Sequence, residues 1–268
     1  MGQDIRLKPL NTLTIPKLIK LQAENFSSKP ALISDNEVLS FADLDNLSTN
    51  IATHLIHLGI LPGDRAAIWA PNMNEWVLAA IAIHKAGGVL VPINTRMKGK
   101  EAAYILNNSE AKFLFSVKTF LGTDYFELLE NEDLPHLLHK ITLDESEPKD
   151  LIQSFETIKE QALDVELPEV SETDMADIIF TSGTTGKPKG VISSHLQNIK
   201  VFEYWSTYIG LNENDQYLIV NPFFHTFGYK AGWLASVMRG ATAYPCPVFD
   251  ADKIIKIINE YQISMLPG

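Results

Sequence analysis

The segment from Thr181 to Gly190 concentrates more candidate chemistry than any other part of this chain. It reads Thr-Ser-Gly-Thr-Thr-Gly-Lys-Pro-Lys-Gly, which places four hydroxyl groups, three glycines and two lysines in ten residues. Glycines let successive backbone N–H groups turn toward one anion, and hydroxyl groups add further donors. Lys187 and Lys189 add positive charge in an otherwise acidic protein. The pattern predicts a loop that binds the polyphosphate of a nucleotide.

Two better-known phosphate motifs do not fit this segment. A Walker A loop requires Ser or Thr directly after its lysine, whereas Pro188 follows Lys187, and the spacing G-x-G-x-x-G is absent. A flexible surface loop rich in Gly, Ser and Thr is the plainer alternative. Glycine makes up about 7% of residues, so three glycines at the fixed spacing of this segment recur by chance about once in three thousand start positions. The complete string therefore favours a dedicated function.

A second stretch, Asn221 to Gly228, places His225 among aromatic residues. A histidine in such surroundings is commonly a packed core residue, but it is also suited to donate a hydrogen bond to a carboxylate. The neighbouring Phe224, Phe227, Tyr229 and Trp233 have the same ambiguity. They form either the walls of an apolar pocket or the buried face of a helix.

The string Thr181–Val191 resembles the signature of the adenylate-forming (AMP-binding) superfamily, which includes the acyl-CoA synthetases. The stretches 221–228 and 61–115 are also similar to that family. The resemblance implies a reaction in two steps. A carboxylate first attacks the α-phosphate of ATP to give acyl-AMP and pyrophosphate, and the thiol of CoA then attacks the acyl-adenylate. Mg²⁺ is the implied metal, and the stretch 225–232 is most similar to ligases for fatty or steroid-type acids.

The resemblance also implies roles for individual residues. The residues expected to bind the phosphates of ATP are Thr181, Ser182, Gly183, Thr184, Thr185, Gly186, Lys187 and Lys189, with Thr181 also contacting Mg²⁺. His225 is expected beside the reacting carboxylate as the catalytic residue. The residues expected to line the acid pocket are Phe224, Phe227, Gly228, Tyr229 and Trp233. His195 is expected either to cap the helix after the loop or to contact the site.

The elements that must position these residues alternate between strands and helices, which predicts an α/β fold. A hairpin is expected at 31–40, followed by a helix that begins at Ser40 with a capping box and ends at Gly59. A βαβ unit is expected over 66–93. Further strands are expected at 112–116, 140–143, 176–180, 217–220, 241–244 and 263–266, and helices at 194–208, 226–239 and 252–261. Residues 144–174 are expected to form a surface connection with one amphipathic piece.

The resemblance implies that the chain is the N-terminal part of a large domain made of stacked α/β lobes. A first lobe is expected at 60–205 and an incomplete second lobe at 14–58 plus 215–268, with the C-terminal cap domain absent. We therefore expect the chain alone to be inactive and a C-terminal half to be missing. The alternative hypothesis is a non-catalytic or partner-completed nucleotide-binding half-domain.

Composition narrows the remaining function classes. The net charge of −11 argues against nucleic acid as a partner, and the apolar fraction of 46% predicts a well-buried core. A single cysteine excludes an intrachain disulfide. The first ten residues do not resemble a signal peptide, and no apolar run is long enough for a membrane span. These features predict a cytoplasmic protein.

Overall fold

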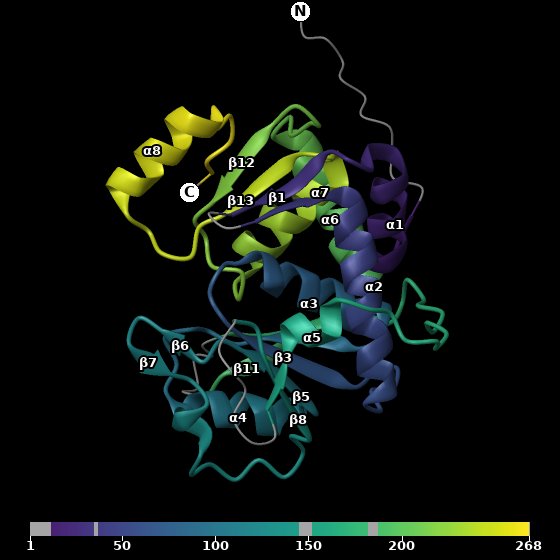
Figure 1. Cartoon of the computed structure of the whole chain (residues 1–268), viewed down its shortest axis with the longest axis vertical. Helices are drawn as coiled ribbons and strands as arrows, with labels where there is room; N and C mark the ends of the chain where they lie inside the picture. Colours follow the sequence, from purple (N-terminus) through teal and green to yellow (C-terminus); the bar gives the residue numbers. More distant parts are fainter. Residues whose placement is uncertain (1–11, 35–36, 145–151, 182–186, 268) are drawn as a thin grey trace, which may run out of the picture.

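The computed structural model describes residues 12–34, 37–144, 152–181 and 187–267. The chain forms two principal β-sheets with helices packed around and between them (Figure 1). The strands are β1 (Pro30–Ile33), β2 (Val38–Ser40), β3 (Arg65–Trp69), β4 (Val89–Pro92), β5 (Phe113–Ser116), β6 (Thr119–Phe120), β7 (Thr123–Asp124), β8 (His139–Thr142), β9 (Ile152–Ser154), β10 (Met175–Thr181), β11 (Lys189–Ser194), β12 (Gln216–Ile219) and β13 (Thr242–Pro245). The helices are α1 (Ile15–Phe26), α2 (Phe41–His57), α3 (Asn74–Lys85), α4 (Gly99–Ser109), η1 (Glu127–Leu129), α5 (Phe155–Lys159), α6 (His195–Tyr208), η2 (Phe227–Leu234), α7 (Ala235–Arg239) and α8 (Ala251–Tyr261).

The larger sheet has seven strands in the order β11-β10-β4-β3-β5-β8-β9. Every neighbouring pair in it is parallel except β10 and β11, which are antiparallel. The central strands β3, β4 and β5 are almost wholly buried, as expected for a parallel sheet covered on both faces. The predicted βαβ unit is confirmed, because β3 and β4 pair in parallel across α3.

The smaller sheet joins two segments that lie far apart in the sequence. Its order is β12-β13-β1-β2, so the early hairpin pairs with strands that begin about 200 residues later. Leu32 of β1 lies beside Ala243 of β13, and β12 pairs with the other edge of β13. In Figure 1 this sheet occupies the upper part of the molecule, and β3, β5, β8 and β11 lie below it.

Helix α3 lies between the two sheets (Figure 1). Eleven of its residues are buried, including Trp76 at its first turn. The ring of Trp76 contacts Phe223, Tyr229 and Trp233 from the segment that follows β12. A helix that is buried on every side must be apolar all round, and α3 is apolar from Trp76 to Ile83 with polar residues only at its two ends. One continuous core therefore runs from the larger sheet through α3 to the smaller sheet.

Local signals predicted both ends of α2 accurately. Ser40 and Asp43 form the predicted capping box at the start of α2. Gly59 follows the end of α2 with φ of +92°, the left-handed conformation that glycine adopts without strain. The expected hairpin at 31–40 is present as β1 and β2.

Two expectations about elements were wrong, and a third was confirmed with an unexpected helix type. The connection 144–174 contains an edge strand, because β9 pairs in parallel with β8, and α5 follows it directly. The expected strand 263–266 is reduced to one isolated bridge between Met265 and Tyr217. The helix expected at 226–239 is present, but its first part, η2, has π-helical hydrogen bonding. Strand length and helix type depend on neighbours that a local pattern does not contain.

No helix among the described ranges is long and apolar enough to cross a membrane.

Two buried histidines connect helices that are remote in sequence. Ser194 caps α6, so the expected capping role of His195 was wrong. His195 is instead buried, and its Nδ1 accepts a hydrogen bond from the backbone N–H of Ile15 at 3.3 Å. Its ring lies 5.2 Å from the ring of His84, centroid to centroid. Burial lowers the pKa of His195 to about 4, and burial also holds the pKa of His84 well below its usual value.

These low pKa values predict that the protein loses stability in mild acid. The unfolded chain binds protons to these histidines near pH 6.5 while the folded protein does not, so stability is complete above pH 6.5 and falls toward pH 4. His195 alone should reduce the free energy of unfolding by about 2 kcal/mol between pH 7 and pH 5. Urea unfolding followed by tryptophan fluorescence measures this loss.

The variant His195→Asn keeps an acceptor near the position of Nδ1 but does not titrate. It should show a flatter dependence of stability on pH than the wild type. The exposed His136, changed to Asn, is the matched control and should leave the dependence unaltered. Equal pH dependence in His195→Asn and the wild type would contradict the assignment.

Candidate functional site

The loop rich in glycine and hydroxyl groups connects two strands of the larger sheet. Thr181 ends β10, and Lys189 begins β11 and pairs with Thr181 in the ladder. The helix expected at 194–208 follows as α6, but the six residues of β11, which lie between the loop and this helix, were not predicted to form a strand. The expected phosphate-binding residues Ser182, Gly183, Thr184, Thr185 and Gly186 lie outside the described residues.

The described ends of this loop present their polar groups outward. Thr181, Lys187 and Lys189 are exposed. Gly190 is explained by packing, because a Cβ atom there would lie 2.7 Å from Cγ2 of Ile178. Thr181 is a single hydroxyl group, and the described part of the chain contains no cluster of three His, Cys, Asp or Glu residues that could hold a metal ion. The described ends of the loop thus present two lysines and the hydroxyl group of Thr181 outward.

His225 lies in the turn between β12 and η2, with its side chain exposed. Its backbone N–H donates to the carbonyl of Pro222 at 3.0 Å, and its Nδ1 accepts from the backbone N–H of Phe227 at 3.4 Å. A neutral histidine that accepts at Nδ1 carries its proton on Nε2. The turn therefore holds the ring with an N–H donor on the nitrogen that makes no contact within the turn.

The aromatic residues expected to line a pocket fall into two groups. Phe224 and Phe227 are half-buried, and the ring of Phe227 contacts Trp205 of α6. Tyr229 and Trp233 are fully buried in the core and stack on each other with centroids 5.2 Å apart. In this structure only Phe224 and Phe227 remain available at the surface beside His225.

Gly228 is required by the close approach of the preceding turn. A Cβ atom at this position would lie 2.3 Å from the carbonyl oxygens of both Asn221 and Pro222. Gly228 was expected to line the acid pocket, and the structure adds a packing role that the sequence did not indicate.

Asn72, at the end of the loop after β3, is a site residue that the sequence reasoning missed. Its Nδ2 donates to the carbonyls of Ile219 at 3.2 Å and Asn221 at 2.9 Å, and its Oδ1 accepts from the N–H of Phe223 at 2.7 Å. The side chain is buried, with 4% of its surface exposed. One amide from the larger sheet thus fixes the turn that carries His225. A polar residue three positions after the end of a buried apolar strand was the available signal.

A buried ion pair is the second feature that the sequence reasoning missed. Nζ of Lys230 in η2 lies 2.8 Å from Oδ1 of Asp177 in β10 and donates to Oγ of Ser193 in β11 at 3.0 Å. Nδ2 of Asn198 in α6 donates to the other oxygen of Asp177 at 2.6 Å. Burial raises the pKa of Asp177, and the adjacent Lys230 opposes that rise. The signal was an acid inside an apolar strand together with a lysine inside an apolar helix.

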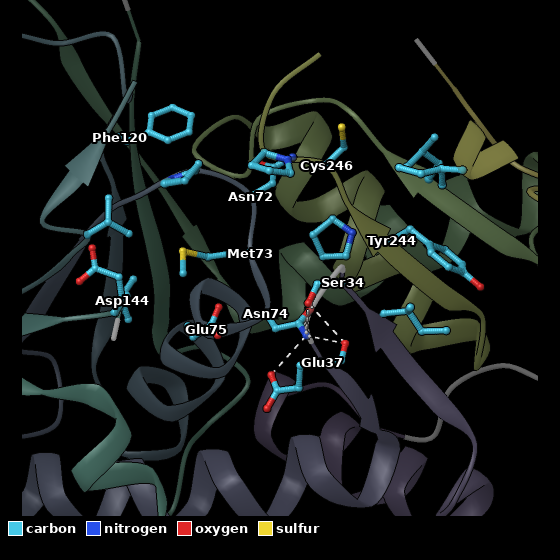
Figure 2. A pocket seen from close by; sticks show the side chains of 18 of the residues that line it. Ser34, Glu37, Asn72, Met73, Asn74, Glu75, Phe120, Asp144, Tyr244 and Cys246 are labelled. Atoms are coloured by element: carbon cyan, nitrogen blue, oxygen red, sulfur yellow. Dashed lines mark hydrogen bonds between the residues drawn. The ribbon is translucent and has the colours of Figure 1, made fainter. Parts of the chain in front are cut away.

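A cavity of about 650 Å³ lies where the loop after β3 faces the end of β13 (Figure 2). Its lining includes Asn72 and Asn74, which follow β3 in the sequence, and Tyr244 and Cys246 at the end of β13. Nδ2 of Asn74 donates to Oγ of Ser34 at 3.2 Å. None of the site residues predicted from sequence that the structure describes lines this cavity. Asn72 therefore separates the cavity from the turn that carries His225.

This geometry defines an α/β protein in which the described ends of the loop between β10 and β11 present Thr181, Lys187 and Lys189 outward, and a separate turn carries an exposed His225. The sequence model of the family described as AMP-binding enzyme matches residues 19–268. The chain belongs to this family, and the relatives reported below are CoA ligases or parts of them.

Three similar proteins place the chain within the family. It is 37% identical to 3-[(3aS,4S,7aS)-7a-methyl-1,5-dioxo-octahydro-1H-inden-4-yl]propanoyl:CoA ligase of Rhodococcus jostii, over 95% of this chain and 52% of the ligase. The N-terminal domain of FACL13 from Mycobacterium tuberculosis is 26% identical with a TM-score of 0.82, over 93% of this chain and 61% of that one. O-succinylbenzoate CoA synthetase from Bacillus subtilis, solved with AMP, is 27% identical with a TM-score of 0.77, over 92% and 59%.

The chain spans about half the length of the ligase sequence that it matches. Its fold is that of the N-terminal domain of adenylate-forming enzymes.

The role of Asn72 predicts a large effect of a small substitution. Asn72→Ala removes three buried hydrogen bonds and leaves two carbonyls and one N–H without that partner, which should lower the free energy of unfolding by about 2–4 kcal/mol. Urea unfolding measures the loss. Asn107→Ala is the matched control, because Asn107 donates a single hydrogen bond from an exposed position and should change stability by less than about 1 kcal/mol. Similar losses of stability in the two variants would contradict the proposal that Asn72 fixes the turn after β12.

Proposed function

We propose that this chain contributes to the ATP-dependent activation of a carboxylic acid, first to acyl-AMP and then to acyl-CoA. The observation that carries the proposal is membership of the AMP-binding enzyme family over residues 19–268, together with a hairpin that presents Thr181, Lys187 and Lys189. The family's solved relatives support ATP as the nucleotide, since one of them was solved with AMP. CoA is the proposed acceptor because the matched relatives are CoA ligases.

The proposed reaction needs two anions, a carboxylate and a phosphate, to approach each other. Lysines and N–H groups near the departing pyrophosphate stabilise the charge that accumulates there as the bond to the α-phosphate breaks. Lys187 and Lys189, with residues 181–186, are the proposed phosphate-binding groups. His225, with its proton on Nε2, is the proposed donor to the carboxylate or to the forming adenylate.

Magnesium would offset the repulsion between these anions when it is bound to the nucleotide. Among the described residues only the hydroxyl of Thr181 is proposed to contact it, and no group of three metal ligands accompanies that hydroxyl. Phosphate oxygens of ATP and water molecules are the further ligands that magnesium ordinarily takes at a nucleotide site.

The proposed acid is of the fatty or steroid-derived type. The half-buried rings of Phe224 and Phe227 beside His225 offer an apolar surface, and the Rhodococcus jostii relative is named for an indanyl-propanoate. The buried positions of Tyr229 and Trp233 make these two residues walls of the core in this structure.

The function is tested by two measurements with different requirements. Isothermal titration of the 268-residue chain with Mg·ATP reports on the phosphate loop alone. Adenylation is measured as carboxylate-dependent exchange of labelled pyrophosphate into ATP. The enzyme for this assay is a chimera in which residues 1–268 of the present chain replace the matching N-terminal half of the Rhodococcus jostii ligase. We expect ATP binding by the chain, and exchange by the chimera with bicyclic propanoates and medium-chain fatty acids. ATP binding without exchange for any acid would instead favour a non-catalytic nucleotide-binding half-domain.

Lys189 should affect the rate of adenylation more than the binding of substrates. Lys189→Ala in the chimera is expected to lower kcat for pyrophosphate exchange about 10²- to 10³-fold, because its contact strengthens as charge moves onto pyrophosphate. Lys200→Ala is the control, since Lys200 is exposed on α6 and pairs with Glu203 one helical turn further along. An unchanged kcat in Lys189→Ala would exclude the assigned role.

His225 should affect the acid half of the reaction and leave the affinity for ATP nearly unchanged. His225→Ala is expected to slow exchange about 10²-fold, in the range for loss of a positioned proton donor. His225→Gln retains an N–H donor near the position of Nε2, whereas His225→Asn retains only an acceptor near Nδ1. We expect the Gln variant to keep more activity than the Asn variant. The opposite order, or a loss of ATP binding with normal turnover at saturation, would show that the assignment is wrong.

A further inference from the structure

The ion pair between Lys230 and Asp177 joins the two parts of the candidate site. Asp177 lies four residues before Thr181 on β10, which is a distance of about 13 Å along an extended strand. Lys230 lies five residues after His225. The ammonium group contacts both strands of the hairpin, because it also donates to Ser193, which is the ladder partner of Asp177.

The burial of this pair is unusually complete. The side chain of Asp177 has no exposed surface, and that of Lys230 is 5% exposed. Two charges taken out of water are stable only when their geometry is good and the remaining polar atoms have hydrogen bonds. Asn198 of α6 satisfies the second oxygen of Asp177 at 2.6 Å. The two helices η2 and α6 and the hairpin of β10 and β11 thus converge on a single carboxylate.

Apolar contacts would hold η2 against the sheet without the free-energy cost of removing two charges from water. Replacing a buried ion pair by apolar residues of similar volume is often neutral or stabilising, so stability alone does not account for the pair. What a hydrogen-bonded ion pair supplies is direction, since the ammonium group must meet Oδ1 of Asp177 and Oγ of Ser193 together. Apolar packing allows a helix to slide by fractions of an ångström without such a penalty.

We propose that Lys230 and Asp177 are positioning residues that fix the base of the phosphate-loop hairpin relative to the turn that carries His225. The catalytic consequence of this inference rests on the function proposed above. Adenylation requires the α-phosphate and the carboxylate to meet at a set distance, and a displacement of about 1 Å can reduce a rate about 10²-fold. The ion pair connects the element that holds the phosphates with the element that orients the proton donor.

The inference is tested first without any ligand, by amide hydrogen exchange of the 268-residue chain. The variant Asp177→Asn/Lys230→Met removes both charges and nearly preserves volume. The matched control is Asp45→Asn/Lys85→Met, which removes the pair in which Nζ of Lys85 lies 2.6 Å from Asp45 and joins α3 to α2. Exchange in the peptides 175–181 and 187–194, and in 222–230, should accelerate at least about tenfold in the first variant only.

Equal exchange of these peptides in the two double variants would overturn the proposal. Should Asp177→Asn/Lys230→Met fail to fold, Ser193→Ala removes one arm of the contact without any change of charge. It should still accelerate exchange of the hairpin, by a smaller factor, and unaltered exchange there would equally overturn the proposal.

The second readout is the pyrophosphate exchange of the chimera. Asp177→Asn/Lys230→Met should lower kcat about 10- to 100-fold while KM for ATP stays within about threefold, because binding contacts remain and only their mutual placement changes. An unchanged kcat for the folded variant would show that the pair is structural. A wild-type chimera without adenylation activity would count against the proposed function, and the hydrogen-exchange comparison would still decide the positioning role.

Discussion

Burial of α3 on all sides is the constraint on which the other contacts depend. The helix crosses between two parallel strands of the larger sheet and also packs against the segment after β12. Because eleven of its twelve residues are buried, it has no face left for water, and both sheets must close around it. The polar groups at its ends then need partners from both sides. His84 bonds to the hydroxyl of Tyr229 at 3.1 Å, and Lys85 bonds to Asp45 of α2.

The same closure explains why the candidate site consists of parts from separate elements. The loop before α3 supplies Asn72, whose amide fixes the turn after β12. The helix after that turn supplies Lys230, whose ammonium group reaches the base of the hairpin between β10 and β11. Each contact crosses between the two sheets and is buried, so each would cost several kcal/mol if one partner were lost. Polar contacts of this kind specify one relative placement where apolar packing alone would allow several.

The site also explains a local departure from regular helix geometry. Segment η2 begins directly after His225 and is π-helical over Phe227–Leu234. Gly228 at its start admits the carbonyls of the preceding turn, at a distance no side chain would tolerate. One π-helical segment rotates the side chains that follow it relative to an α-helix, and such segments occur frequently at functional sites. Here the rotation accompanies the inward placement of Tyr229, Lys230 and Trp233.

The sequence by itself determined the features that depend on neighbours within a few residues. The capping box at Ser40, the turn at Gly59, the βαβ unit over 66–93 and the family signature at 181–191 are all local patterns, and local patterns are readable without a structure. Tertiary structure alone decided that β11 separates the loop from α6, that β9 joins the sheet edge, and that Tyr229 and Trp233 belong to the core. It also decided the partners of Asn72 and Lys230. A strand or a buried charge is stable only with a partner, and these partners lie 147 and 53 residues away along the chain.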